Sequence, residues 1–171
     1  MRLLKKTVDR IQNGDQQPEW PDPDVSLAGP AYLPDGYVSD SAQKLHLYRR
    51  LSRVGGRTEV ESLRMELKDR FGPLPAEAGR LLDMTVVRVL GRTLGVERIL
   101  VNKDSARVTF RQGVVPRMAI LDGPLRQRHT EAEIRRMDPF SLVLKQVGLD
   151  PILETVMVAM DALRSAQAEP N

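Results

Sequence analysis

Few side chains in this sequence of 171 residues could carry out nucleophilic, acid–base or metal chemistry. There is no cysteine, which excludes disulfides, thiolate metal sites and cysteine nucleophiles. The two histidines, His46 and His129, have no second metal-binding or catalytic partner near them in the sequence. The Walker motifs of ATPases and the Gly-x-Ser-x-Gly motif of serine hydrolases are also missing. We therefore expect no catalytic residue, no metal, no cofactor and no enzymatic activity.

The stretch Leu63–Pro75 contains the most informative polar residues. Glu66 and Asp69 are three positions apart in a predicted helix, so both carboxylates lie on one flank of it. They fall in its last turns, where the helix dipole disfavours acids. Compensation is expected from Arg70 or from cations that a partner supplies. A second interpretation, ordinary surface acids near Lys68 and Arg70, stays open on the sequence alone.

A basic cluster in and after the preceding predicted helix is the second candidate site, formed by Lys44, Arg49, Arg50, Arg53 and Arg57. Such a patch could contact nucleic-acid phosphates, but nucleic-acid-binding modules usually add stacking aromatic rings or a recognition helix. Only Tyr48 is near, and its spacing places it on the apolar stripe of the helix. We therefore favour a solvated face, or one that faces an acidic partner, over direct DNA binding.

The composition is that of a globular domain, because 41% of the residues are hydrophobic, 29% are charged and the net charge is +3. A chain of this length corresponds to one domain with a sizeable core. No apolar run approaches the roughly 20 residues of a membrane span. Arg2, Lys5 and Lys6 interrupt the early apolar stretch that a signal peptide would need. We expect no membrane contact and a cytoplasmic location.

The sequence pattern divides the chain into four parts. Residues 1–14 have the apolar spacing of the end of a helix, and residues 15–24 form a linker rich in proline and acids. Residues 25–165 are predicted to form the single domain, and residues 166–171 form a polar tail that we expect to fray. Trp20 is the one large apolar side chain of the linker, and we expect it to pin the linker to the core.

Apolar residues at helical spacing predict three consecutive helices in the first half of the chain. These helices span about Asp40–Arg53, Thr58–Phe71 and Pro75–Leu94. Thr58–Glu61 matches a capping box at the start of the second helix. Gly95 follows the third helix as its expected stop.

Apolar and β-branched runs predict strands around Val25–Leu27, in a hairpin of Val96–Val101 with Ala106–Phe110, and over Ser141–Val147. The order of these elements, with helices first, strands next and a helix last, predicts the fold class. We expect an α+β fold, with N-terminal helices packed on one side of a small, mainly antiparallel sheet and with a closing C-terminal helix.

Three segments of the second half are less regular. Arg117–Leu121 fits either a further strand or a short helix. Thr130–Glu133 matches a second capping box and predicts one or two helical turns. Asp150 followed by Pro151 predicts a cap and the first position of the closing helix.

The stretch Glu66–Pro75, with the sequence ELKDRFGPLP, resembles a signature of the C-terminal domain of bacterial transcription-repair coupling factors, the Mfd family. Four further segments are similar to that domain: Leu3–Val8, Leu33–Val38, Leu45–Leu51 and Leu94–Val96. Together they cover most of residues 1–110, and after residue 110 only the order of the elements is similar.

The resemblance implies a regulatory role. In this family a motor driven by ATP translocates on DNA and dislodges stalled RNA polymerase, and an N-terminal module similar to UvrB recruits UvrA. The C-terminal domain packs against that module and hides its UvrA-binding surface. Acids of the signature helix meet arginines of the module. Carried over to this sequence, these acids are Glu66 and Asp69, with Arg70 beside them at the interface.

We therefore hypothesise an autoinhibitory interaction domain of transcription-coupled nucleotide-excision repair. Its direct partner would be the UvrB-like module of the same protein, and UvrA and RNA polymerase would be reached only through the parent. The alternative hypothesis is a nucleic-acid-binding accessory module that uses the basic cluster between Lys44 and Arg57. Steeply salt-dependent DNA binding by the chain would favour this alternative.

Overall fold

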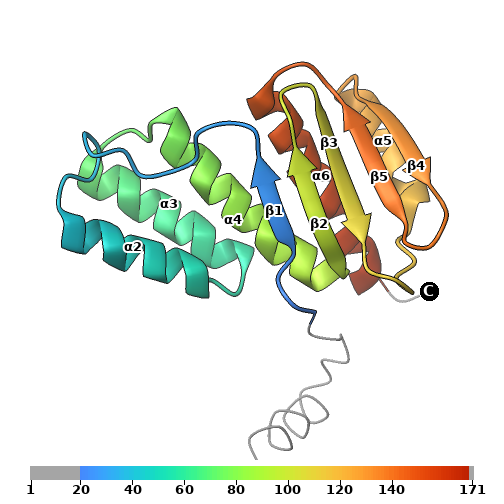
Figure 1. Cartoon of the computed structure of the whole chain (residues 1–171), viewed down its shortest axis with the longest axis horizontal. Coiled ribbons are helices and arrows are strands. Elements are labelled where there is room, and N and C mark those ends of the chain that lie inside the picture. The colour runs from blue at the N-terminus through green and yellow to red at the C-terminus, as the bar shows by residue number, and fades with distance from the viewer. Residues whose placement is uncertain (1–19, 170–171) are drawn as a thin grey trace, which may run out of the picture.

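The sheet of this protein has five strands in the order β1–β2–β3–β5–β4 (Figure 1). A computed structural model describes residues 20–169 of the chain. The strands are β1 (Asp24–Leu27), β2 (Val96–Val101), β3 (Ser105–Phe110), β4 (Glu131–Arg135) and β5 (Ser141–Lys145). β1 pairs with β2 in parallel, and the other three pairs are antiparallel.

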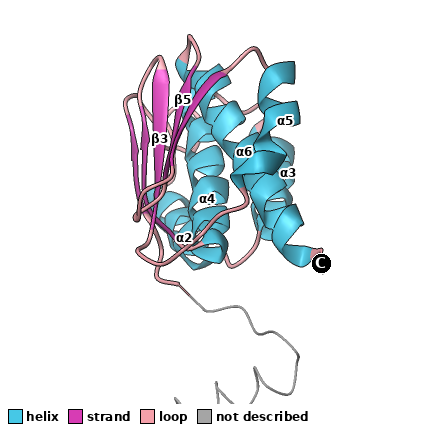
Figure 2. Ribbon diagram, turned by 90° about the vertical axis from the view of Figure 1, so that its right-hand side faces the viewer, coloured by secondary structure: helices cyan, strands magenta, loops and turns pink. Residues whose placement is uncertain are grey.

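The helices lie on one side of the sheet (Figure 2). They are α2 (Ser41–Arg53), α3 (Arg57–Phe71), α4 (Ala76–Leu94), α5 (Asp122–Gln127) and α6 (Leu149–Ala168), with a 3-10 turn, η1, over Met118–Leu121. α4 and α6 pack against the sheet, whereas α2 and α3 lie beyond the β1 edge and pack on α4 (Figure 1). This arrangement confirms the predicted α+β fold class.

The core lies between the sheet and the helices that cover it. Alternate residues of β3, namely Ala106, Val108 and Phe110, are buried, and so are Leu142 and Leu144 of the neighbouring β5. Period-two burial of this kind leaves the opposite sheet face to polar side chains. The apolar face of α6 completes the core with Ile152, Leu153, Val156, Ala159, Met160 and Leu163.

The predicted helices of the first half are confirmed, but the side-chain caps predicted for α3 and α6 are not. α3 begins at Arg57 after Gly56, and no side chain caps it, so the capping box at Thr58–Glu61 was wrong. Gly148 precedes α6, and Asp150 does not cap the helix but pairs with Arg80 of α4. Gly148 has φ +100°, which favours glycine, whereas Gly56 is in extended backbone that any residue can adopt.

In the second half of the chain, the predicted helix at Thr130–Glu133 is wrong, and the choice between strand and helix at Arg117–Leu121 is decided. Thr130–Glu133 does not open a helix, because residues 131–135 form β4 and pair with β5 along its whole length. Cross-strand pairing therefore outweighs the local capping pattern. Arg117–Leu121 contains η1, which confirms the helical alternative. α6 continues to Ala168 and buries Ala166, although we predicted fraying from residue 166.

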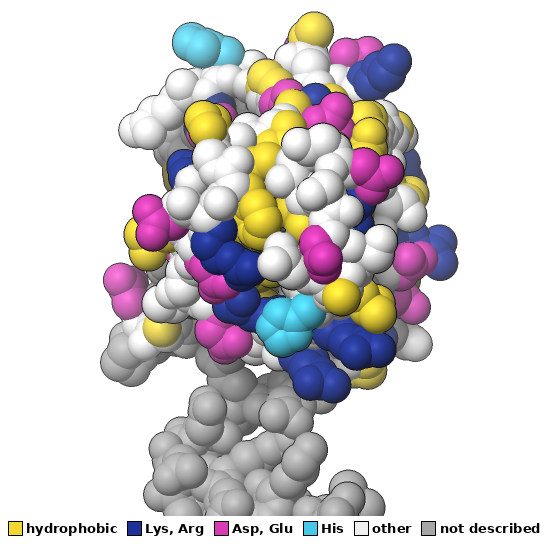
Figure 3. Space-filling view, turned by 90° about the vertical axis from the view of Figure 1, so that its left-hand side faces the viewer, with side chains coloured by type: hydrophobic (Ala, Val, Ile, Leu, Met, Phe, Trp, Pro, Cys, Tyr) yellow, Lys and Arg dark blue, Asp and Glu magenta, His cyan; other side chains and the backbone are white. Residues whose placement is uncertain are grey.

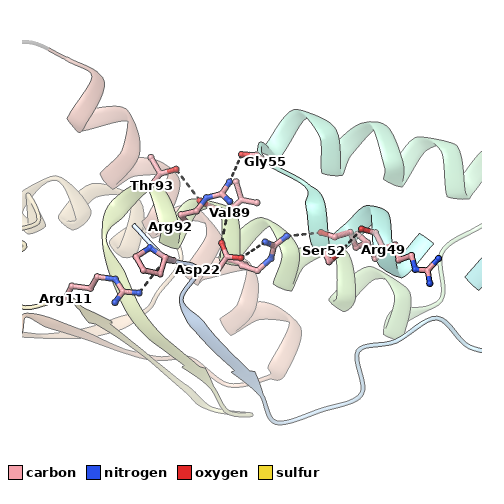
Figure 4. A network of polar contacts seen from close by, with 11 residues as sticks. Asp22, Arg49, Ser52, Gly55, Val89, Arg92, Thr93 and Arg111 are labelled. Atoms are coloured by element: carbon pink, nitrogen blue, oxygen red, sulfur yellow. Dashed lines mark hydrogen bonds and ion pairs between the residues drawn. The ribbon is translucent and has the colours of Figure 1, made fainter. Parts of the chain in front are cut away.

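The segment before β1 is fixed to α4 (Figure 4). The Asp22 carboxylate pairs with Arg88 at 3.0 Å and with Arg92 at 3.5 Å. The same two guanidiniums donate to the carbonyls of Leu51 and Gly55, at the end of α2 and in the loop that follows it. Two arginines of α4 thus join the chain before β1 to the α2–α3 pair.

Trp20 lies half-buried against the start of β2, in a hollow that it shares with Leu94 and Val114. A Cβ atom on Gly95 would come within 3.0 Å of the indole nitrogen. This confirms that Trp20 pins the linker to the core. The rest of the predicted linker up to residue 19, and the predicted helix over residues 1–14, lie outside the described residues.

Two glycines of α4 lead to opposite predictions. A Cβ on Gly91 would lie 2.8 Å from Cγ of the buried Pro23, whereas a Cβ on Gly79 would meet no atom within 4 Å. We expect Gly79→Ala to raise the free energy of unfolding by about 0.5–1 kcal/mol, because alanine favours the helix. We expect Gly91→Ala to lower it by about 1–2 kcal/mol, because Pro23 must move. Urea unfolding measures both, and a stabilising Gly91→Ala would contradict the tight contact.

Candidate functional site

Tyr37 positions the end of α3, where the candidate acids lie. The Tyr37 hydroxyl donates to the carbonyls of Leu67 and Gly72 at 3.0 and 2.9 Å, and its ring packs against Phe71 with the centroids 5.7 Å apart. These bonds satisfy carbonyls that a helix end leaves without partners. Burial raises the pKa of Tyr37, so the hydroxyl keeps its proton. A second tyrosine, Tyr48 of α2, has a hydroxyl that accepts from the Leu33 N–H at 2.9 Å and so holds the segment before α2.

Glycine ends α3 in a conformation that other residues rarely adopt. Gly72 has φ +87°, and its N–H donates to the Lys68 carbonyl at 3.0 Å. A side chain at this φ would be strained, so Gly72 allows the sharp turn toward α4. The last turn of α3 is therefore fixed both by its own backbone and by Tyr37.

Glu66 is held by two arginines. Both of its carboxylate oxygens accept from the Arg50 guanidinium of α2, at 2.8 and 2.7 Å, and Oε1 also accepts from Arg70 at 2.8 Å. The hydrogen bonds from Arg50, supported by Arg70, outweigh the opposing effect of burial and lower the pKa of Glu66 to about 2. The side chain keeps 32% of its surface exposed, so it remains within reach of a partner.

The arginines around Glu66 were only partly foreseen. The compensation expected from Arg70 is confirmed, whereas Arg50 was missed because it lies 16 positions away in another helix. Asp69 differs from Glu66, since it is exposed and makes no ion pair or hydrogen bond within residues 20–169. Of the two acids, Asp69 has the carboxylate that is free for a cation from outside.

The low pKa of Glu66 makes stability depend on pH. A folded-state pKa of about 2, against a usual value of 4.5, means that the ionised carboxylate stabilises the fold above about pH 4.5. This stabilisation is lost as the pH falls from about 4.5 to about 2. Because the side chain is 32% exposed, solvent screening limits the effect to about 1 kcal/mol.

An NMR titration of the Glu66 carboxyl carbon tests this ion pair. We expect a pKa near 2 in the unchanged chain. In the variant Arg50→Gln the pKa should rise toward the usual value of 4.5, because the strongest hydrogen bonds to the carboxylate are gone. A Glu66 that titrates near 4.5 in both chains would mean that Arg50 does not hold it in solution.

The surface around Glu66 and Asp69 combines charged and apolar side chains. On the face of the molecule that Figure 3 shows, basic and acidic side chains are interspersed around a strip of apolar ones. Met65 of α3 is 66% exposed, and Arg64 pairs with Asp83 of α4 at 2.6 Å, which fixes α3 against its neighbour. Between α2 and α3 there is also a hollow of about 400 Å³, with Arg50 and Arg53 in its wall. The surface around Glu66 and Asp69 offers free charge, exposed apolar side chains and a recess, as many docking surfaces do.

The five residues of the predicted basic cluster do not form one unpaired patch. Three of them are ion-paired: Lys44 with Asp35, Arg50 with Glu66, and Arg57 with Asp161. Arg49 and Arg53 are exposed and have no acidic partner among the described residues. Internal acids thus neutralise most of the charge that the sequence suggested for a nucleic-acid contact.

Within residues 20–169 no group of three or more acids and histidines is placed so that it could hold a metal ion. His46 lies exposed on α2, and His129 lies in the loop between α5 and β4. No helix of this part of the chain has the length and apolar character needed to cross a membrane.

Comparison with known sequences points to one family. The model of the TRCF domain matches residues 27–119. The transcription-repair-coupling factor of Myxococcus xanthus is 37% identical over 124 residues, which are 72% of this chain and 10% of that protein. That of Rickettsia prowazekii is 39% identical over 88 residues, or 52% of this chain and 8% of that protein. The Escherichia coli protein is 32% identical over 115 residues, or 64% of this chain and 10% of that protein. The match to this chain thus spans about a tenth of the length of these relatives.

A solved structure has the same fold. The crystal structure of the C-terminal domain of a transcription-repair coupling factor superposes with a TM-score of 0.73. The match covers 90% of this chain and 99% of that one, at 23% sequence identity. The similarity therefore concerns the whole arrangement of helices and sheet described above.

Proposed function

From the premise that this chain belongs to the TRCF domain family, as the C-terminal domain of a transcription-repair coupling factor and not its motor region, we propose that it is an autoinhibitory interaction domain. In this proposal it docks on the N-terminal UvrB-like module of its parent and covers the surface that binds UvrA. RNA polymerase and UvrA are partners of the parent, and the chain itself performs no catalysis in the cytoplasm where repair takes place.

The acidic edge of α3 is the observation that supports this function best. Asp69 offers an exposed carboxylate without a partner in residues 20–169, and Glu66 keeps an exposed fraction while Arg50 and Arg70 fix its orientation. A carboxylate can accept several hydrogen bonds, so an arginine of a partner can bind Asp69 and also reach the outer side of Glu66. The expected partner surface is therefore rich in arginine.

Polar contacts of this kind suit a mask that must open. A domain hides a site only by the free energy of its own contact, and release requires a competing state that lacks the contact. Charged contacts at an exposed edge fix the orientation of docking and add little permanent adhesion. The exposed Met65 beside them supplies apolar contact without a large apolar interface. An opening step of the parent can therefore release the domain.

A nucleic-acid accessory role is the alternative function. The ion pairs within the basic cluster make it the less favoured one, because they neutralise three of the five cations. Only Arg49 and Arg53 of the predicted cluster are left without an acidic partner in the described part of the chain. Two phosphate contacts give weak binding with a shallow salt dependence. Tight binding of duplex DNA by the isolated chain, with a steep salt slope, would reverse this order of preference.

A binding assay between this chain and the UvrB-like module of the same coupling factor tests the proposal. We expect a saturable complex that weakens as salt rises, because exposed charge pairs are screened. The module with its surface arginines replaced by glutamine serves as the control partner and should bind at least about tenfold more weakly. Absence of binding at low salt, or equal binding to the control module, would contradict the proposed function.

A further inference from the structure

A further hollow, with several arginine and hydroxyl side chains in its lining, lies on the face of the sheet that the helices leave uncovered. It has a volume of about 420 Å³ and is lined by Arg107, Thr109, Arg135, Arg136, Met137, Asp138, Pro139 and Ser141. The strand register explains the floor of the hollow, because Thr109 of β3 lies opposite Ser141 of β5, and Ser141 lies opposite Arg135 of β4. Neighbours across strands are about 5 Å apart, so the two hydroxyls and the guanidinium stem form one row.

Longer side chains of the lining surround this row. Ser141 is 7% exposed although it belongs to the uncovered face, so its neighbours shield it. Arg107 flanks the row from β3, and Arg136 from the turn after β4. The hydroxyls of Thr109 and Ser141 bond to no other group within residues 20–169. The hollow thus combines hydrogen-bond donors in the floor with positive charge at the sides.

The charge of the hollow is not balanced by its own residues. Arg107 and Arg136 make no ion pair with any described residue, and Arg135 has an exposed contact with Glu133 at 3.1 Å. Asp138 is the acid in the lining, and its Oδ1 already accepts from the Gly113 N–H at 2.9 Å. Counting Glu133 with Asp138, three guanidiniums stand against two carboxylates, which leaves Arg107 and Arg136 without an acidic partner among the described residues.

We propose that this hollow binds a phosphate group with two negative charges, either as inorganic phosphate or as the monoester of a small molecule. Guanidiniums match the geometry of phosphate oxygens and bind them through paired hydrogen bonds. Threonine and serine hydroxyls can donate to the remaining oxygens. No aromatic ring lines the hollow, so it lacks the stacking surface with which nucleic-acid bases are held. The site is separate from the acidic edge of α3 and does not depend on the masking role.

An NMR titration of the whole chain with inorganic phosphate and with glycerol phosphate tests the proposal. We expect saturable shifts of the backbone amides of Thr109, Gly113 and Ser141, and none with acetate at the same ionic strength. In the double variant Arg107→Gln, Arg136→Gln the affinity should fall at least about tenfold, because two of the three guanidiniums are lost. Both side chains lie on the surface, so the variant should keep the fold.

The double variant Arg49→Gln, Arg53→Gln is the matched control, because both are exposed arginines of α2 without an acidic partner within residues 20–169 and neither lines the hollow. It should bind phosphate as the unchanged chain does. Three results would overturn the proposal: no saturable shift, equal affinity in the double variant of Arg107 and Arg136, or tighter binding of a DNA duplex than of either phosphate at the same amides. The last result would assign the hollow to a nucleic-acid backbone.

Discussion

Replacing both Glu66 and Asp69 with arginine is expected to weaken binding to the UvrB-like module by roughly 100-fold or more, because two attractive charges become repulsive at one interface. The measurement is the binding assay with the UvrB-like module, at low salt. The same change has an internal cost, since Arg50 and Arg70 then face an arginine where they had bound a carboxylate. The double variant must therefore be checked for its thermal unfolding before its binding is interpreted.

Asp69→Arg alone separates the two effects. Asp69 has no partner within the described residues and lies in the last turn of α3, where the helix dipole favours a cation, so its replacement should leave the unfolding temperature unchanged or slightly higher and weaken binding by about tenfold. Glu97→Arg is the control, because Glu97 is an exposed acid of β2 that also makes no ion pair in residues 20–169. Equal losses in the two variants would mean that overall charge, and not the edge of α3, determines binding.

Replacing Tyr37 with alanine is expected to lower the free energy of unfolding by about 2–3 kcal/mol, because the ring contact with Phe71 and the hydroxyl bonds are both lost. Tyr37→Phe removes only the hydroxyl and should cost about 1 kcal/mol. Urea unfolding gives both values. Hydrogen exchange should become faster first at the amides of the last turn of α3, which contains Asp69 and ends at Phe71.

The tyrosine variants also test whether a well-fixed end of α3 is needed for docking. Tyr37→Phe should weaken docking slightly, since the acids of α3 remain in a helix whose last turn is less well fixed. If Tyr37→Phe and Tyr37→Ala were equally stable, the ring contact would add nothing, and the hydroxyl alone would hold the end of α3. A variant with unchanged exchange in α3 would contradict the role of Tyr37 altogether.

The fold could be predicted where one local pattern dominates. Helical spacing in α4 and strand alternation in β3 each reflect burial of one face, which a sequence records directly. β4 was missed because its residues 131–135 are mostly exposed and carry little alternation, so the capping-box pattern was the stronger local signal. Its strand conformation results from pairing with β5, which is a tertiary effect.

The sequence was enough to predict the helix that carries the candidate acids, but not the charges that surround them. The spacing of Glu66 and Asp69 placed both on one flank of a helix, as observed. Two contacts could not be predicted: Arg50 binds Glu66, and Tyr37 holds the end of α3. Both depend on which side chains of separate elements meet in the fold. Such contacts over 16 and 30 positions have no signature in one sequence. The hollow on the uncovered sheet face was missed for the same reason, because it joins residues of three strands.

The masking role is tested most directly by the amount of UvrA that the full-length coupling factor captures. The parent with Asp69→Arg in its C-terminal domain is compared with the parent carrying Glu97→Arg and with the unchanged protein. Our account predicts that Asp69→Arg alone raises UvrA capture, because loss of the edge contact exposes the UvrB-like module. Equal capture by all three proteins, with the isolated domains shown to be folded, would contradict it.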